Sequence, residues 1–178
     1  AASTFDSLLA ADDGSSAVST AVAEVYVARS LFATGNSARA LPLATQALAV
    51  CVESGAAAPT MLAHMAMAEG ALAVRRHADA LASADASLAV VERDLPQWVN
   101  RMHLLRASAL LQAGDIAAAA TAVDAGMDAS PAGADGWRVR RQLEAVRLMA
   151  TPATATWPTA AAEELTDDLL QARWYGIA

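Results

Sequence analysis

YVARSLFATG, at residues 26–35, is the stretch that decides the fold, because its pattern of small and large residues returns twice along the chain. The equivalent segments are AMAEGALAVR at residues 66–75 and LRASALLQAG at residues 105–114, which lie 40 and 79 positions later. A pattern that returns about every 40 residues is typical of stacked helical hairpins, each of which buries its apolar side against its neighbours. The sequence therefore predicts a helical-repeat scaffold.

Small residues occupy matched positions in the three repeats. Three sets of positions share this property: Ala28, Ala68 and Ala107; Ala40, Ala80 and Ala119; and Ala47, Ser87 and Gly126. Without large side chains between them, two helix axes can approach to about 8 Å, the lower end of the usual range. We therefore expect these positions to be buried between helices, and we expect a bulky substitution there to destabilise the fold.

Glycine, proline and capping residues separate the apolar-periodic segments and so predict where helices begin and end. They indicate helices at residues 4–11, 15–34, 38–54, 59–75, 78–92, 96–113, 116–130, 137–150 and 159–174. Pro42 lies about one turn into one of these helices, where we expect it to kink the helix or delay its start. No strand is expected, because the alternation of β-branched and aromatic residues that strands show is absent.

The predicted fold is therefore all-α, a superhelix of about three helical hairpins followed by C-terminal capping helices. Residues 1–14 form an N-terminal helical segment, residues 15–131 hold the three repeats of about 40 residues, and residues 132–178 form the capping region. Terminal repeats of such solenoids need a cap, since otherwise their apolar face is open to water.

Composition excludes several classes of function. The chain has 178 residues and a net charge of −7, with twelve arginines and no lysine, which disfavours direct binding of nucleic acid. The absence of lysine also removes Schiff-base chemistry and the lysine of a phosphate-binding loop. No apolar run reaches the roughly 18 residues of a membrane span, and Cys51 is the only cysteine, so we expect a cytoplasmic protein without disulfides.

The repeats between residues 21 and 131 resemble the tetratricopeptide-repeat (TPR) family. The motif of that family appears as Ala28, Leu31, Gly35, Ala40 and Ala47-Leu48 in the first repeat, and as Ala107, Leu110, Gly114, Ala119, Gly126-Met127 and Pro131 in the third. The second repeat departs from it with Ala71, Arg75 and Ser87, and the early tryptophan is replaced by Glu24, His64 and His103. The repeats are also longer than the usual 34 or so residues, as in solenoid domains of bacterial multi-domain transcription regulators.

Few residues suggest chemistry. Glu24, His64 and His103 occupy equivalent sites and have the side chains that zinc accepts, but interhelix packing is the competing interpretation. Cys51 has no basic activator nearby in the sequence, so we expect a buried, inert thiol. No nucleophile elbow or phosphate loop is present. We therefore predict no enzyme, no metal and no cofactor.

Two groups of residues near the C-terminus each allow two interpretations. Arg138, Arg140, Arg141 and Arg147 concentrate positive charge, either as a solvated helix face with Arg140 paired to Glu144 or as a site for an acidic partner or nucleic acid. Trp157, Trp174 and Tyr175 concentrate aromatic area. They suit either a tail that covers the open end of the solenoid or an anchor for another subunit.

The TPR resemblance implies a ligand groove along the first helix of each repeat. Carried over one repeat at a time, the groove residues are Val22, Val25, Arg29, Phe32, Leu62, Met65, Glu69, Leu72, Arg101, Leu104, Ser108 and Leu111. The lysines and asparagines of the family's peptide-carboxylate clamp are absent. An apolar floor with isolated charges at Arg29, Glu69 and Arg101 instead suits an amphipathic helix or a small apolar ligand. The competing interpretation is that these side chains only pack helix against helix.

The sequence thus predicts a non-enzymatic module that binds a protein or peptide, and it is compatible with a homo-oligomer. One alternative is a ligand-sensing domain of a larger transcription regulator, since the chain begins with Ala1 rather than methionine and we expect it to be part of a longer or processed protein. Another alternative, an enzyme with its site inside the solenoid, is disfavoured by the scarcity of clustered catalytic groups.

Overall fold

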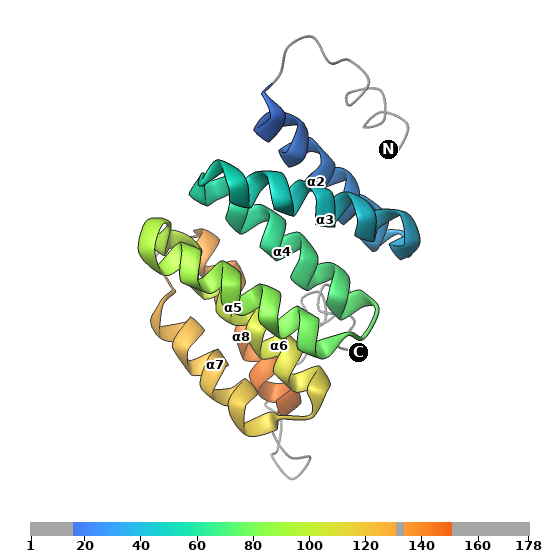
Figure 1. The fold of residues 1–178 in the computed structure, drawn as a ribbon. Helices are drawn as coiled ribbons and strands as arrows, with labels where there is room; N and C mark the ends of the chain where they lie inside the picture. The colour runs from blue at the N-terminus through green and yellow to red at the C-terminus, as the bar shows by residue number, and fades with distance from the viewer. Residues whose placement is uncertain (1–15, 131–133, 151–178) are drawn as a thin grey trace.

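A computed structural model describes residues 16–130 and 134–150, and every regular element in these ranges is a helix. The elements are α2 (Ala17–Ala33), α3 (Ser37–Ser54), α4 (Ala57–Ala73), α5 (His77–Asp94), a short 3-10 helix η1 (Pro96–Trp98), α6 (Val99–Ala113), α7 (Ile116–Asp128) and α8 (Ala134–Ala150). Consecutive helices pack against each other in the order of the chain, as Figure 1 shows. The fold is thus the all-α helical-repeat superhelix that the sequence predicts.

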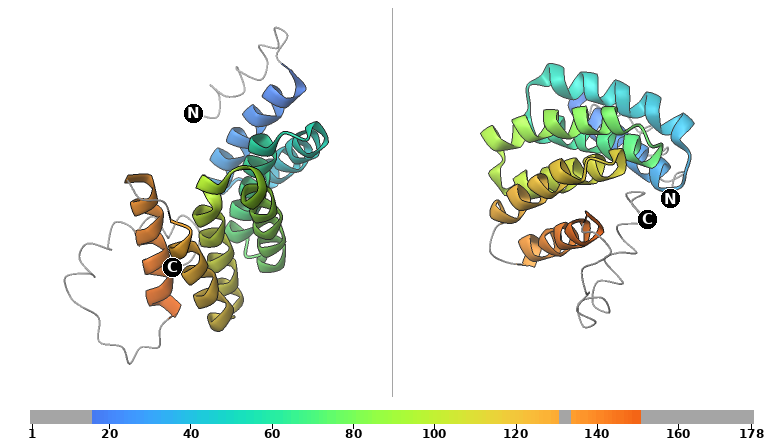
Figure 2. Two further views of the ribbon diagram at one scale, coloured as in Figure 1. Left: turned by 90° about the vertical axis from the view of Figure 1, so that its left-hand side faces the viewer. Right: turned by 90° about the horizontal axis from the view of Figure 1, so that it is seen from below.

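Three hairpins, α2–α3, α4–α5 and α6–α7, stack one after another from the N-terminal to the C-terminal end of the described chain (Figure 2). The first helices of successive hairpins touch directly, with α2 against α4 and α4 against α6, and α6 in turn touches α8. Each second helix packs mainly on the first helices on either side of it in the chain. Equivalent positions of α2, α4 and α6 are therefore brought onto one side of the molecule.

The matched small residues lie where the helices cross. Ala28, Ala40, Ala68, Ala80, Ala107 and Ala119 are each 0% exposed. The third set is buried too, and there the small residues accommodate particular neighbours. The Ser87 hydroxyl lies 2.8 Å from the Met102 sulfur, and a Cβ at Gly126 would lie 2.9 Å from the Cβ of His103. The prediction that these positions allow close helix packing is confirmed.

The turn inside each hairpin uses one residue in the left-handed conformation. Gly35 has φ of 78° and Gly114 has φ of 85°, and the equivalent residue of the second repeat, Arg75, has φ of 59°. The left-handed region costs an arginine about 1–2 kcal/mol, whereas glycine enters it freely. The second turn therefore keeps the geometry of the other two without their glycine.

Several predicted helix boundaries were wrong by one to three residues. Helix α4 begins at Ala57, two residues before the expected start, because a proline such as Pro59 is tolerated in the first turn. The segment expected to be one helix from Pro96 is split into η1 and α6, and α8 begins at Ala134 rather than at residue 137. Such boundaries depend on capping and tertiary contacts as well as on local pattern.

Pro42 does not delay the start of its helix, which was one of the two effects expected of it. Helix α3 begins at Ser37 and continues through the proline to Ser54. Pro42 and Ala38, whose carbonyl would have accepted the missing N–H bond, are both exposed. Water can therefore hydrate that carbonyl, which lowers the cost of the lost hydrogen bond.

Helix α8 covers the apolar side of the last hairpin. Val139, Leu143 and Val146 are buried in a cluster with residues of α6 and α7, while Arg140 and Glu144 are exposed. This amphipathic arrangement is what a terminal cap requires. The predicted helices at residues 4–11 and 159–174, and the aromatic residues Trp157, Trp174 and Tyr175, lie outside the described residues.

Candidate binding surface on the first helices

The twelve predicted groove residues fall into two classes. Six are buried and belong to the packing between helices: Val25, Phe32, Met65, Leu72, Leu104 and Ser108. Six are partly exposed: Val22, Arg29, Leu62, Glu69, Arg101 and Leu111. Helix packing explains why the six buried side chains are apolar or small. Only the six partly exposed side chains could touch a ligand in this structure.

The six partly exposed groove residues and the exposed Tyr26 define the surface that we call the first-helix face. It consists of Val22, Tyr26, Arg29, Leu62, Glu69, Arg101 and Leu111. Within α2 and α4 the members recur at helical spacing, so each set lies on one side of its helix. Sequence reasoning missed Tyr26, which is 43% exposed and lies one turn before Arg29. Its position four residues after Val22 was the available signal.

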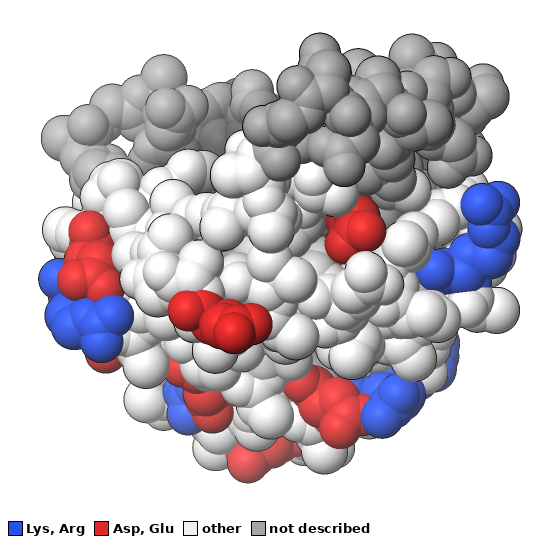
Figure 3. All heavy atoms as spheres, turned by 45° about the horizontal axis from the view of Figure 1, so that its top comes forward, with Lys and Arg blue, Asp and Glu red and all other residues white. Residues whose placement is uncertain are grey.

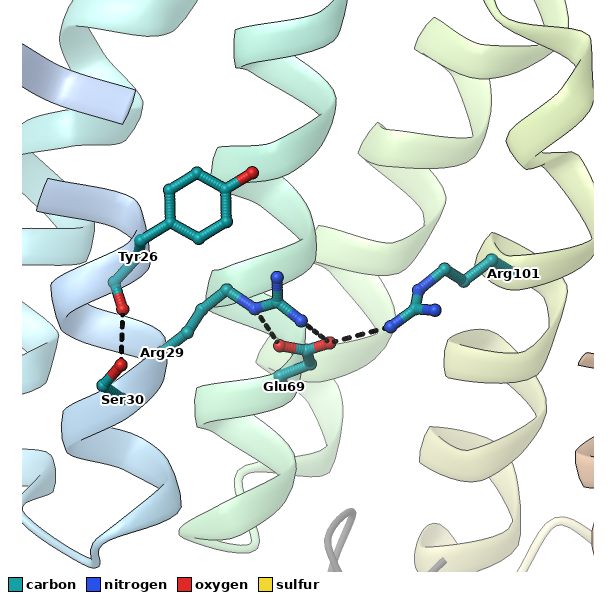
Figure 4. A network of polar contacts seen from close by, with 5 residues as sticks. All are labelled: Tyr26, Arg29, Ser30, Glu69 and Arg101. Atoms are coloured by element: carbon teal, nitrogen blue, oxygen red, sulfur yellow. Dashed lines mark hydrogen bonds and ion pairs between the residues drawn. The ribbon is translucent and has the colours of Figure 1, made fainter. Parts of the chain in front are cut away.

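Arg29 and Glu69 form a two-point ion pair between α2 and α4. Arg29 Nε donates to Glu69 Oε2 at 2.7 Å, and Arg29 Nη2 donates to Glu69 Oε1 at 3.1 Å, as Figure 4 shows. Two parallel charge-assisted bonds orient both groups and are stronger than neutral hydrogen bonds. The side chains are 26% and 15% exposed, so the pair is partly shielded from water.

Arg101 reaches the same carboxylate from α6, but more loosely. Its Nη2 lies 4.0 Å from Glu69 Oε1, and its side chain is 29% exposed. Its Nε is buried and has no hydrogen-bond partner among the described residues. Two arginines therefore face one carboxylate, and Arg101 is held by it more loosely than Arg29.

The charges on the three first helices were expected to be isolated, and that expectation was wrong. Arg29 and Glu69 occupy equivalent positions in consecutive repeats, and direct contact between α2 and α4 brings these positions together. The equivalent residue in α6 is Ser108, which is buried and donates to the carbonyl of Leu104 at 2.8 Å. The second arginine comes instead from Arg101, two turns earlier in α6.

Glu24, His64 and His103 do not form a metal site in the described structure. Within residues 16–130 and 134–150, no three His, Cys, Asp or Glu side chains are grouped so that they could hold a metal ion. Burial lowers the pKa of His64 and of His103, and it raises the pKa of Glu24. The Nδ1 atoms of both histidines are buried without a hydrogen-bond partner in the described part of the chain. For the two histidines, these are the properties of side chains that pack between helices.

Cys51 is an inert thiol. It is 0% exposed within a cluster that includes Val25 and Ala47. Burial raises the pKa of the thiol, and the charge of Glu24 raises it further. Both effects disfavour the thiolate, which is the nucleophilic form.

One arginine of α8 connects this helix to α7. Arg147 forms an ion pair with Asp124 of α7, and Arg140 is exposed. On the face drawn in Figure 3, the charged side chains of the described residues form small separate groups with uncharged surface between them. This face therefore offers no continuous basic surface of the kind that nucleic-acid binding uses.

A shallow cavity of about 220 Å³ lies between α3, α4 and α5. Its walls include Leu41, Met67 and Val74, and the Arg76–Asp79 ion pair lies beside them. Ligand pockets usually have volumes of roughly 300 Å³ or more, so this cavity suits at most a single side chain of a partner.

No described helix combines the length and the apolar character that are needed to cross a bilayer. No family model matches the chain, and searches of curated proteins and of solved structures found no significant match.

Proposed function

We propose that this chain is a TPR-like, non-enzymatic binding module whose first-helix face holds an amphipathic helical segment of a protein partner. The observation that supports this most is the Arg29–Glu69–Arg101 group, in which Arg101 is partly exposed and only loosely paired with Glu69. The partner segment would carry a carboxylate for Arg101 and apolar residues for the surface around it.

The apolar part of this surface is contributed by Val22, Leu62 and Tyr26. These side chains are partly or largely exposed, and they lie one or two turns before the charged residues of α2 and α4. An amphipathic helix recognises such a surface through apolar residues spaced three or four apart. Tyrosine is also frequent among residues that contribute strongly to protein interfaces.

The electrostatic part favours an acidic partner. The Arg101 side chain is 29% exposed and its Nη2 lies 4.0 Å from Glu69 Oε1, so a ligand carboxylate could form a charge-assisted hydrogen bond with this guanidinium. Glu69 is already engaged by Arg29 through both oxygens, which leaves Arg101 as the least compensated charge. A carboxylate placed beside Arg101 would pair with the more loosely held of the two arginines.

The test is selection from a displayed library of 16-residue helical peptides against the full chain and its Arg101→Gln variant. We expect the full chain to enrich peptides with apolar residues at helical spacing and an acidic residue beside them, and we expect Arg101→Gln to lose that enrichment. Arg39→Gln, at an exposed arginine of α3, is the matched control and should select the same peptides as the unmodified chain. Identical selections from the Arg101→Gln variant, or no enrichment at all, would contradict the proposal.

A further inference from the structure

Two departures of the second repeat from the repeat pattern meet at one place in the structure. Ala71 stands where the first and third repeats have leucine, and Arg75 stands where they have glycine. Ala71 lines the cavity between α3, α4 and α5, and Arg75 lies in the chain between Val74 and Arg76, which line the same cavity. Both changes therefore alter the surroundings of this cavity.

The cavity occupies the space that a leucine fills in the third repeat. There Leu110 is 7% exposed and belongs to a buried cluster against which Leu81 of α5 and Ala118 of α7 pack. Their counterparts in the second repeat all line the cavity: Ala71, Leu41 and Asp79. A buried leucine that is replaced by alanine leaves a void where the surrounding residues do not collapse into it. The small side chain of Ala71 thus accounts for the opening.

The size of the cavity fits one large apolar side chain. Its volume is about 220 Å³. An apolar cavity of about 150 Å³ is large enough for benzene, so this one admits the side chain of a leucine or a phenylalanine. Leu41 of α3 and Met67, Ala71 and Val74 of α4 supply apolar walls. Val74 is 40% exposed, so this side of the cavity is open to solvent.

Arg75 adds an uncompensated positive charge next to the cavity. Its neighbour Arg76 is already paired with Asp79. Arg75 is exposed and has no ion pair with any residue in the ranges 16–130 and 134–150. Its backbone has φ of 59°, a conformation that glycine adopts without strain. The second repeat therefore has a charged side chain at a turn where glycine would be more relaxed, and a carboxylate is the group that a guanidinium binds best.

We infer that this cavity, which we call the second-repeat pocket, docks a segment of a protein partner through one leucine or phenylalanine side chain, with an aspartate or glutamate beside it for Arg75. The apolar side chain takes the place of the leucine that the second repeat lacks, against Leu41, Met67 and Val74. The neighbouring carboxylate pairs with the guanidinium of Arg75 and fixes the direction of the bound segment.

The second-repeat pocket lies on the other side of α4 from the first-helix face. Ala71 follows Leu62 by nine residues, about two and a half helical turns, so these side chains point in opposite directions. Glu69 follows Leu62 by seven residues, about two turns, and shares its side. The inference is therefore independent of the proposed function, and each surface can be altered without the other.

The probe is a displayed library of ten-residue peptides with a leucine or phenylalanine at the centre and randomised polar residues elsewhere. Peptides with a single apolar residue lack the apolar stripe through which an amphipathic helix would bind the first-helix face. We expect selection against the full chain to enrich peptides that have aspartate or glutamate within two positions of the central residue. Enriched peptides are then synthesised with a fluorescent label and titrated by fluorescence anisotropy.

Two variants alter the apolar walls of the pocket. Ala71→Leu introduces the residue of the other repeats and should weaken peptide binding by at least about 10-fold, because the anchor side chain loses its space. Val74→Ser changes an exposed position that the fold tolerates, and it should weaken binding by about 3-fold or more. The matched control is Val52→Ser in α3, at a valine that is 51% exposed and does not line the pocket. It should leave binding unchanged.

Two further variants test the charge. Arg75→Gln should weaken binding by about 3-fold, whereas Arg75→Lys, which keeps the positive charge, should retain most of the affinity. Arg101→Gln, on the first-helix face, should have no effect on these peptides. Thermal unfolding of every variant shows whether it remains folded. If Ala71→Leu does not fold, the comparison of Val74→Ser with Val52→Ser decides.

Several outcomes would overturn the inference. They are full affinity in both Ala71→Leu and Val74→Ser, an equal loss in Val52→Ser, a loss in Arg101→Gln, enrichment without a preference for acidic residues, and the absence of any enriched peptide. A dimer in sedimentation velocity that Ala71→Leu abolishes would also overturn it, because a second copy of the chain would then occupy the pocket. None of these results alters the test of the proposed function, which depends on Arg101.

Discussion

Gly70→Ala is expected to destabilise this protein, although alanine is the better residue for the interior of a helix. Gly70 lies in α4, where the Phe32 ring of α2 packs directly on its backbone. A Cβ at this position would lie 2.3 Å from Phe32 Cζ, 2.4 Å from Cε2 and 2.6 Å from Cε1. The ring is 7% exposed, so it has little room to withdraw.

The magnitude follows from two opposing terms. Ordinary contact begins near 3.4 Å, so the ring or the helix must move by about 1 Å, and overpacking of this kind costs about 1–3 kcal/mol. The helix propensity of alanine returns about 1 kcal/mol. The net expectation is a loss of about 1 kcal/mol in the free energy of unfolding, and of about 2 kcal/mol if neighbouring residues do not adjust.

A double-mutant cycle with Phe32→Leu separates the two terms. Without the ring, Gly70→Ala should be neutral or stabilising by up to about 1 kcal/mol, because only the propensity term remains. The assay is urea denaturation followed by far-ultraviolet circular dichroism on the four proteins. If Gly70→Ala stabilises the protein equally with and without the Phe32 ring, then the ring does not pack on this glycine and the reasoning is refuted.

Three further predictions concern the turn, the histidines and the ion pair. Arg75→Gly should raise the free energy of unfolding by about 0.5–1 kcal/mol in the same urea assay, because the left-handed backbone at this position strains any residue with a Cβ; a loss of stability would contradict this. The pKa values of His64 and His103 lie below 6.5 in the folded state, so the unfolded state takes up protons first and stability should fall as the pH drops from about 7 to 5. The double variant His64→Gln, His103→Gln should lose less stability over this pH range. If its stability depends on pH as strongly as that of the unmodified chain, the two histidines do not cause the effect. Arg29→Glu should cost about 1 kcal/mol or more by opposing two carboxylates, and addition of Glu69→Arg should restore most of it; thermal unfolding of the single and double variants checks this.

The core of the fold could be predicted closely from the sequence, because the relevant signals are local and periodic. Ala28 and Ala40 are buried where the repeat spacing placed them, and glycine marks the left-handed turns at Gly35 and Gly114. Arg75 shows the limit of such signals. The second repeat has no glycine at this turn, yet the helices on either side impose the same backbone conformation on Arg75. Tertiary packing outweighs a local cost of about 1–2 kcal/mol.

For the candidate surface, the sequence by itself determined which helices contribute and which positions are equivalent, because a regular repeat places equivalent residues on the same side of the solenoid. The spacing of 40 residues makes Arg29 and Glu69 equivalent, but their ion pair became visible only in the contact between α2 and α4. Only the tertiary structure decided that Phe32 and Met65 are buried rather than exposed. It alone also brought Arg101 to Glu69, because the contact joins positions that are not equivalent and depends on how far α4 and α6 are offset along their axes. That offset is set by the packing of side chains between the helices, which no single segment of the sequence encodes.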